Sequence, residues 1–260
     1  KENEESKVFL KSKKPIVIIG ESALETKSGK YIFENIKKFL SDNNFINDKW
    51  NALNILVQNA STIGAIDLGF FKKNNSENFE FFNKLKNHEF NLLYFVGSDN
   101  LDFTKKDEFI IYQGSHGDRT AQIADIILPS PAFTEQNGIF LNLEGRLQKS
   151  VKCNYPPGEA KEDWKIFNLI SKKLNNQPLF KNFKDLRNDT VSKINDHTDF
   201  DILPKIKIKK STVDPGSFTK ETILIKEIDY YFSNSIARSS KTMSDCRSVR
   251  AKNFEQKTGS

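Results

Sequence analysis

Cysteine is scarce in this 260-residue sequence, which contains only Cys153 and Cys246, far apart in the chain. Disulfide frameworks, thiolate zinc sites and iron–sulfur clusters take their ligands from closely spaced cysteines, such as a Cys-x-x-Cys pair. No such spacing occurs here. The sequence therefore excludes an iron–sulfur cluster or a four-thiolate zinc site held by this chain alone.

Long hydrophobic runs are also missing. No apolar stretch approaches the length of about 20 residues that a membrane-spanning helix needs, so we expect no direct membrane insertion. Residues 1–14 are polar and include the acids Glu2, Glu4 and Glu5. They fit neither a signal peptide nor an Arg-rich transit peptide, and we interpret them as a polar leader. The first residue is not methionine, which indicates a processed or partial product.

Concentrated charge and histidine clusters are absent as well. The net charge of +6 is diffuse, and the short basic runs at 11–14 and 205–210 are interleaved with acids or apolar residues. This pattern favours a solvated face over a nucleic-acid-binding patch, so we expect no nucleic-acid partner. None of the three histidines, His88, His116 and His197, has a second ligand at metal-binding spacing, so we predict no metal site.

The sequence does contain a repeated α/β pattern. A hydrophobic fraction of 37%, with 22 phenylalanines, is sufficient for a real core. Apolar residues at helical spacing predict helices over 29–40 and 159–174. Short apolar runs that end in Gly or Pro predict strands, buried on both faces, of a mostly parallel, doubly wound sheet. These runs are 15–20, 53–57 (which also fits a helical turn), 91–97, 109–114 and 124–128.

The character of the sequence changes after Trp164. We predict a helix over 180–195, a Pro-punctuated irregular stretch over 196–219, an extended segment over 221–232, and a last helix, capped by Ser233 or Ser235, through Cys246. These segments have few local apolar partners, so we expect them to lie over other surfaces. The predicted organisation is a polar leader at 1–14, an α/β domain at 15–178, and a helix plus an extended, partner-binding tail at 179–260.

One loop is the main candidate for a ligand site. Gln113-Gly-Ser-His-Gly-Asp-Arg119 follows a predicted strand and precedes a predicted helix, where doubly wound sheets bind nucleotides and phosphates. Its spacing is neither Gly-x-Gly-x-x-Gly nor a P-loop, and the favoured interpretation is a tight turn in which Asp118 caps the next helix. His116 beside Asp118 offers a base and its orienter, but no nucleophile accompanies them, so we predict no catalytic residue.

A hairpin is predicted further along the chain. Asn137-Gly138 supports a positive φ, and Glu144-Gly145 separates two alternating segments. Arg146 and Glu144 near the tip can pair with each other, or bind a ligand or a partner. The residues alone leave these alternatives open.

Several of these segments resemble the molybdopterin oxidoreductase superfamily, and their flanks resemble the large iron–sulfur subunit of respiratory complex I, the 75-kDa subunit of mitochondria. The first resemblance rests on Ala124-Asp-Ile-Ile-Leu-Pro129, Phe133-Thr-Glu135, Gly138, Asn142-Leu-Glu-Gly-Arg146 and Gln148. The second adds the segments 14–24, 53–56, 65–70, 111–118, 156–158, 162–166 and 235–243, with Cys246.

The resemblance implies the superfamily fold but no cofactor in this chain. In that family the cluster ligands lie in N-terminal domains, so iron–sulfur clusters are expected in domains outside this sequence or in a partner chain. The complex I relatives are understood to keep the fold without the pterin. The family's His-His-Gly-Asp is Ser115-His-Gly-Asp118 here. Candidates for a vestigial crevice are Gly114, His116, Gly117, Asp118, Asn142, Glu144, Gly145 and Arg146.

The role that the resemblance implies is structural. The chain is expected to be part of the matrix arm of complex I at the mitochondrial inner membrane, where it supports electron transfer from NADH to ubiquinone. Its partners would be other matrix-arm subunits, including a chain with the N-terminal iron–sulfur domains. It would thus be a component of an NADH:ubiquinone reductase with no catalytic residues of its own. The alternative is a fragment of a molybdopterin-dinucleotide-binding oxidoreductase that uses the 113–119 loop and the 142–148 hairpin.

Overall fold

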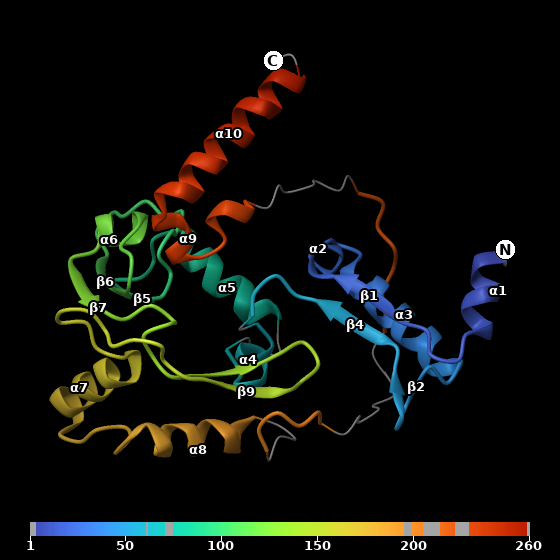
Figure 1. The fold of residues 1–260 in the computed structure, drawn as a ribbon, viewed down its shortest axis with the longest axis horizontal. Coiled ribbons are helices and arrows are strands. Elements are labelled where there is room, and N and C mark those ends of the chain that lie inside the picture. Colours follow the sequence, from blue (N-terminus) through green and yellow to red (C-terminus); the bar gives the residue numbers. More distant parts are fainter. Residues whose placement is uncertain are drawn as a thin grey trace. The chain divides into compact units, whose positions relative to one another are not determined.

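The computed structural model describes residues 4–60, 62–70, 75–194, 199–204, 214–221 and 229–258. The chain divides into two compact units, each made of segments that are distant in sequence. Unit 1 comprises 1–70, 139–149 and 188–225, and unit 2 comprises 71–138, 150–187 and 226–260. Helices alternate with parallel strands in each unit (Figure 1), which confirms the predicted α/β class.

Unit 1 is built on a two-stranded parallel sheet. In this sheet β1 (Val17–Gly20) pairs with β4 (Leu53–Leu56), so the predicted run at 53–57 is a strand and not a helical turn. A short antiparallel pair, β2 (Ile46–Asn47) and β3 (Trp50–Asn51), precedes β4. The helices around these strands are α1 (Glu4–Lys11), α2 (Glu21–Leu24), α3 (Gly29–Asp42) and α4 (Thr62–Asp67).

The first core of unit 1 forms where α3 meets the turn that follows it. Leu40, Phe45 and Ala52 are buried there, because α3 carries its apolar side chains at helical spacing. The helix α1, which lies within the stretch expected to be a polar leader, contributes to this core. Phe9 of α1 packs edge-on against Phe45, with ring centroids 5.5 Å apart.

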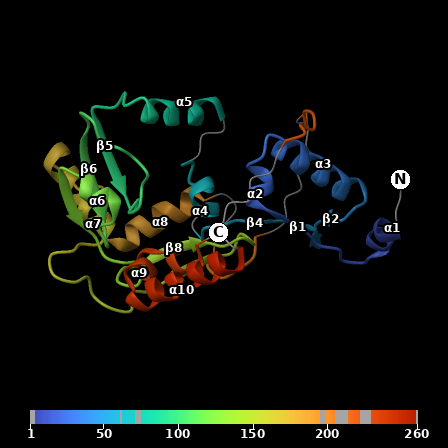
Figure 2. The same cartoon turned by 90° about the horizontal axis from the view of Figure 1, so that it is seen from above.

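Unit 2 is built on a three-stranded parallel sheet with β6 in the centre (Figure 2). The strands, in spatial order, are β5 (Leu92–Val96), β6 (Phe109–Gly114) and β7 (Ile126–Pro129). The central strand is the most buried, with Ile110 and Gln113 at 0% exposure. Three helices of unit 2 precede its C-terminal segment, namely α5 (Asn75–Lys86), α6 (Arg119–Ile123) and α7 (Asp163–Asn175).

The edge strands are less buried than their apolar sequences predict. Ile18 in β1 is 64% exposed and Ile127 in β7 is 53% exposed, so the prediction of burial on both faces is wrong at these positions. Successive side chains of a strand point to opposite faces of its sheet. Ile19 is therefore 5% exposed while its neighbour Ile18 is open. The described strands form small separate sheets, in which only β6 has a strand on each side.

The predicted hairpin is present as β8 (Gly138–Leu141) and β9 (Leu147–Ser150). Leu141 and Leu147 pack with Ile194, just after α8 (Phe183–Lys193), in a second buried cluster. The turn of the hairpin lies at 142–146, around the predicted Glu144-Gly145, and Gly145 has a φ of 80°. Neither Asn137 nor Gly138 has the positive φ that this pair was predicted to support.

The C-terminal segments lie over surfaces of their own chain. In unit 1, residues 214–221 contact the start of α3, where Ser28 Oγ donates to the Thr219 carbonyl at 2.9 Å. In unit 2, η1 (Tyr230–Phe232) is followed by α9 (Ser235–Ser239) and α10 (Lys241–Thr258). Asn234 caps α9 by accepting from the Ala237 amide at 2.9 Å. The predicted single helix ending at Cys246, capped by a serine, is therefore wrong.

Three sequence predictions fall on residues that the structure does not describe. They concern His197, the basic run at 205–210 and most of the segment predicted as extended at 221–232. Within the described ranges, no helix has both the length and the apolar character needed to cross a bilayer.

Asp125, the residue before β7, links β7 to the start of β6 through hydrogen bonds. Its carboxylate accepts from the Ile110 amide at 2.7 Å and from Lys105 Nζ at 2.5 Å. The backbone hydrogen bond from Ile110, followed by the hydrogen bond and charge of Lys105, lowers the pKa of Asp125 below its ordinary value. A depressed pKa means that folding favours the ionised carboxylate.

We predict that stability falls on acidification partly through Asp125. The contribution of this carboxylate is complete above its unfolded pKa of about 3.9 and is lost as the pH falls through the lower folded pKa. Asp125→Asn should lower stability at pH 7 and flatten the decline below about pH 4, measured as the free energy of unfolding in urea. The matched control is Asp102→Asn, because the Asp102 side chain is fully exposed. Equal effects of the two substitutions would contradict the prediction.

Candidate functional site

The carboxyl ends of β5 and β6 bring two loops together in unit 2. The carboxyl ends of parallel strands lie at the same edge of a sheet, and doubly wound folds bind ligands in the crevice beside that edge. β5 is followed by Gly97, Ser98 and Asp99, and β6 is followed by residues 115–118. The Gly97 amide donates to the Gln113 carbonyl at 2.8 Å, which keeps the two loops adjacent.

Asp99 is the central acid of this site. Its side chain is 9% exposed, and one carboxylate oxygen accepts a hydrogen bond from the Tyr112 hydroxyl of β6. Burial raises the pKa of Tyr112, and the hydrogen bond and charge of Asp99 raise it further. The phenol therefore remains a neutral donor to the carboxylate at physiological pH.

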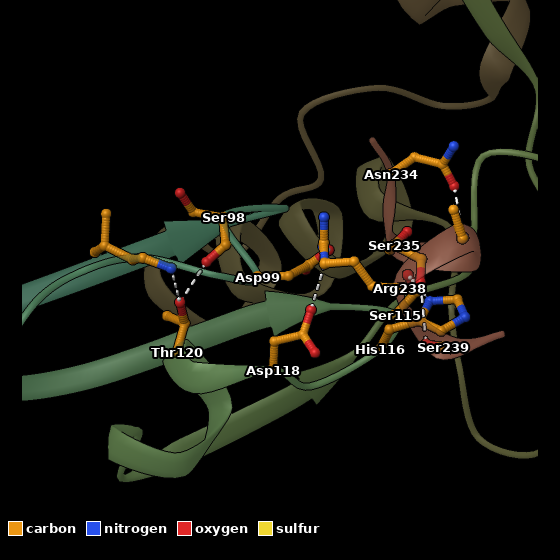
Figure 3. Close-up of polar contacts among 12 residues, drawn as sticks. Ser98, Asp99, Ser115, His116, Asp118, Thr120, Asn234, Ser235, Arg238 and Ser239 are labelled. Carbon is orange, nitrogen blue, oxygen red and sulfur yellow. Dashed lines mark hydrogen bonds and ion pairs between the residues drawn. The ribbon is translucent and has the colours of Figure 1, made fainter. Parts of the chain in front are cut away.

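Arg238 of α9 contacts both strand-end loops (Figure 3). Its Nη2 lies 3.1 Å from Asp99 Oδ2, and its Nε lies 2.7 Å from Asp118 Oδ2. The Arg238 side chain is 18% exposed. A guanidinium presents several donors in a fixed plane, so one arginine can satisfy two carboxylates at once. The tail is thereby fastened to the site by a charge-assisted pair.

Thr120 fixes α6 against the loop that follows β5. Its hydroxyl donates to the Ser98 carbonyl at 2.5 Å and accepts from the Leu101 amide at 3.1 Å. The Thr120 amide donates to the Asp99 carbonyl at 3.1 Å. Thr120 is completely buried, so these bonds replace those that water would make.

The predicted crevice residues of the first loop surround this network. Gly114 has no room for a side chain, because a Cβ would lie 2.0 Å from the Tyr112 hydroxyl oxygen. Gly117 makes the turn with a φ of 48°. His116 Nδ1 lies 2.7 Å from Ser115 Oγ, and no hydrogen bond joins His116 to Asp118. The geometry therefore gives no support to a base with its orienter.

Asp118 occupies the predicted position before α6, but its role differs from the prediction. Its side chain makes no capping hydrogen bond to the helix. The carboxylate instead binds Arg238, 120 residues further along the chain. The ion pair competes for the same oxygens that a cap would use, and a bond to a charged donor is the stronger of the two.

The remaining candidates, Asn142, Glu144, Gly145 and Arg146, belong to unit 1 and form the hairpin turn. Asn142 Oδ1 accepts from the amides of Glu144 at 3.0 Å and Arg146 at 2.8 Å. Arg146 Nη1 donates to the Asp201 carbonyl at 2.5 Å, and its Nε lies 3.7 Å from Glu144 Oε2. The structure shows the first alternative, in which Arg146 and Glu144 pair with each other, and adds a bond from the arginine to the chain's own backbone.

The site in unit 2 does not fit an anionic dinucleotide. Two carboxylates, Asp99 and Asp118, face a single guanidinium that is already paired with both. A pyrophosphate needs amide donors or cations that are free to bind it. The Cα of Gly114, where a backbone could approach a ligand, is covered by Tyr112. In the described part of the chain, no group of three or more His, Cys, Asp or Glu could hold a metal.

Sequence reasoning did not identify the residues that dominate this site, namely Asp99, Tyr112 and Arg238. Asp99 was detectable, because it directly follows a predicted parallel strand and such ends converge at one side of the sheet. The ion pair between Asp99 and Arg238 was not detectable, because a separation of 139 residues leaves no local pattern in the sequence.

We predict that Arg238 stabilises the docking of α9. Arg238→Ala leaves the carboxylate of Asp99 buried without its cation, so it should cost about 1–3 kcal/mol of unfolding free energy. Arg238→Lys should recover only part, because one ammonium does not reproduce the planar fork. The control Arg247→Ala removes an exposed pair with Asp229 and should cost below about 1 kcal/mol. Equal losses, or unchanged hydrogen exchange in α9, would refute the prediction.

Comparison with known proteins identifies related sequences. The family model of molybdopterin oxidoreductases matches residues 2–173. The chain is 35% identical over 257 residues to the NADH-ubiquinone oxidoreductase 75 kDa subunit of Reclinomonas americana, covering 94% of this chain and 35% of that protein. It is also 35% identical over 247 residues to an NADH-quinone oxidoreductase subunit of Rickettsia typhi, covering 94% of this chain and 34% of that protein.

A fungal relative shows a similar identity and a similar coverage. The mitochondrial NADH-ubiquinone oxidoreductase 78 kDa subunit of Neurospora crassa is 31% identical over 260 residues, covering 96% of this chain and 34% of that protein. The chain thus spans about a third of the length of these curated relatives. The chain belongs to the molybdopterin oxidoreductase family, and its homologues include the 75 kDa and 78 kDa subunits of NADH-ubiquinone oxidoreductases and their bacterial NADH-quinone counterparts.

Proposed function

We propose that this chain is a structural and assembly portion of the matrix arm of NADH:ubiquinone oxidoreductase. In this role it supports electron transfer from NADH to ubiquinone without carrying a redox centre or a catalytic residue itself. The observation that carries the proposal is the pairing of Asp99 and Asp118 with Arg238. At the side of the sheet where this fold binds ligands, the chain binds its own tail.

The iron–sulfur clusters of the complex are proposed to lie outside this chain. The chain supplies only two cysteines, and both are exposed and unpaired. The clusters would lie in N-terminal domains that precede this region or in a separate chain of the split subunit. That polypeptide and neighbouring matrix-arm subunits are the proposed partners. The proposed location is the mitochondrial inner membrane, on its matrix side. The name of the Neurospora relative, a mitochondrial subunit, supports the mitochondrial part of this proposal.

Cofactor analysis of the purified chain tests the assignment of no redox centre. We expect substoichiometric iron and molybdenum by elemental analysis and no pterin fluorescence after denaturing extraction, because the strand-end donors are already engaged. A chain isolated from its native complex and dissociated under mild conditions is the appropriate sample. One equivalent of pterin with molybdenum would favour the alternative, a molybdopterin-dinucleotide-binding oxidoreductase fragment.

Native gels test the assembly role. The tagged chain should co-migrate with NADH dehydrogenase activity in a complex much larger than itself. Arg146→Ala should lower the amount of assembled complex severalfold, because it removes the bond from the hairpin to the Asp201 carbonyl at 2.5 Å. Turnover per assembled complex should be unchanged, since no reacting group is lost.

The matched control for Arg146→Ala is Arg119→Ala, whose side chain is 67% exposed. It should leave both the abundance and the activity of the complex near those of the unmodified chain. Normal abundance of a complex that has lost NADH oxidation on Arg146→Ala would oppose the structural role.

A further inference from the structure

A pocket on α7 is unrelated to the strand-end site. It has a volume of about 600 Å³ and lies between α7 and the chain that returns after this helix. Its floor is apolar and includes Trp164, Leu169 and Phe180. This volume is within the range of about 300–1,000 Å³ that is typical of ligand sites in proteins.

The walls of the pocket are held in place by partly buried hydrogen bonds. Asn168 of α7 clamps Phe180 by donating to its carbonyl at 2.7 Å and accepting from its amide at 3.0 Å. Ser171 Oγ donates to the Gln177 carbonyl at 2.9 Å. These bonds fix the returning chain on the helix. The pocket is therefore formed before any ligand binds, which lowers the entropic cost of binding.

The start of α7 is itself anchored to the sheet of unit 2. Asp163 accepts from Gln113 Nε2 at 2.6 Å and from Gln136 Nε2 at 2.8 Å. Gln113 is completely buried in β6 and also accepts from the Tyr94 hydroxyl at 2.5 Å. The helix that carries the pocket thus has a fixed position on a rigid strand.

Lysines surround the apolar floor. The residues that line the pocket include Lys161, Lys165, Lys172 and Lys181 and no acid. Lys165 lies 3.7 Å from the buried Glu162 carboxylate. Among the described residues, no carboxylate forms an ion pair with Lys172 or Lys181. Lys161 lies 3.8 Å from the exposed Glu159 carboxylate. The pocket therefore presents Lys172 and Lys181, which have no ion pair within the described residues, as cations beside an apolar surface.

The spacing of the cations selects the kind of ligand. Lys165 and Lys172 are seven residues apart on one helix, which places their backbones about 10 Å apart at 1.5 Å of rise per residue. A fatty acid offers one carboxylate, whereas two lysines at this spacing can each pair with a separate one. An extended peptide advances about 3.3 Å per residue, so acids roughly three residues apart match the two lysines. An apolar side chain between those acids would lie over Leu169.

We propose that this pocket binds an acidic segment of a partner protein. An aromatic or branched apolar side chain of that segment occupies the floor, and its carboxylates pair with Lys172, Lys181 and Lys165. Such pairs form next to an apolar surface that excludes water, where charge complementarity contributes to specificity as well as association rate. The proposal does not depend on the assembly role, because the binding site lies within unit 2 of the isolated chain.

The test is a binding titration of the complete 260-residue chain. The probe is the fluorescein-labelled peptide acetyl-Glu-Asp-Phe-Glu-Asp-amide, followed by fluorescence anisotropy. We expect saturable binding with one site per chain. The neutral analogue acetyl-Gln-Asn-Phe-Gln-Asn-amide should bind at least tenfold more weakly, because it keeps the apolar side chain but loses the charges.

Variants locate the site. The double substitution Lys172→Glu with Lys181→Glu should weaken peptide binding at least tenfold, and Leu169→Asn should weaken it severalfold. The matched controls are Lys184→Glu, an exposed lysine outside the lining, and Leu174→Asn, on the same helix at 76% exposure. Both controls should bind within twofold of the unmodified chain. All substituted side chains are at least partly exposed, and thermal unfolding verifies that each variant is folded.

Three results would overturn the proposal. They are no saturable binding by the unmodified chain, equal weakening by the lining and control variants, and displacement of the peptide by decanoate or by oligothymidylate at lower concentrations than unlabelled peptide. The last result would assign the pocket to a small amphiphile or to nucleic acid. Displacement that requires higher concentrations of both competitors would support the peptide.

Discussion

The buried carboxylate of Asp99 is the constraint on which the strand-end region of unit 2 depends. A carboxylate removed from water must be paired, because an isolated buried charge is costly. Asp99 meets this requirement with the Tyr112 hydroxyl and the Arg238 guanidinium. It thereby connects β5, β6 and α9, and Asp118 brings the loop before α6 into the same network. Residues separated by 139 positions in sequence are held together by this single acid. The network also explains why a region placed to bind a ligand binds the tail.

The same rule positions α7. Gln113 on the central strand is completely buried, so both ends of its amide need partners. Tyr94 supplies the donor and Asp163 the acceptor, and Asp163 is the first residue of α7. The buried side of α7 is thus fixed by polar pairing, while its outer side remains free to carry lysines and exposed leucines. One side of α7 thus bonds to the sheet, and its other side carries the proposed peptide site.

The hairpin motif Asn142-Leu-Glu-Gly-Arg146 is held by hydrogen bonds within its own turn and to one neighbouring segment. Asn142 binds two amides of its own turn, Gly145 adopts the positive φ, and Arg146 binds a carbonyl on a neighbouring segment. A signature shared with a family of cofactor enzymes therefore has a sufficient explanation in local structure. Residues that identify a family need not perform its chemistry, because function is decided by the site and not by the fold.

The sequence by itself determined the α/β class, the apolar strand runs, the helices at α3 and α7, and the presence of a hairpin near Gly145. These features depend on local periodicity and turn chemistry, which a short window of residues contains. It did not determine that β1 and β4 pair apart from β5, β6 and β7, nor that Asp118 would bind Arg238 in place of capping α6. Those outcomes belong to the tertiary structure alone. Strand partners and ion pairs are chosen by which buried groups meet after distant segments pack, and no local pattern records that choice.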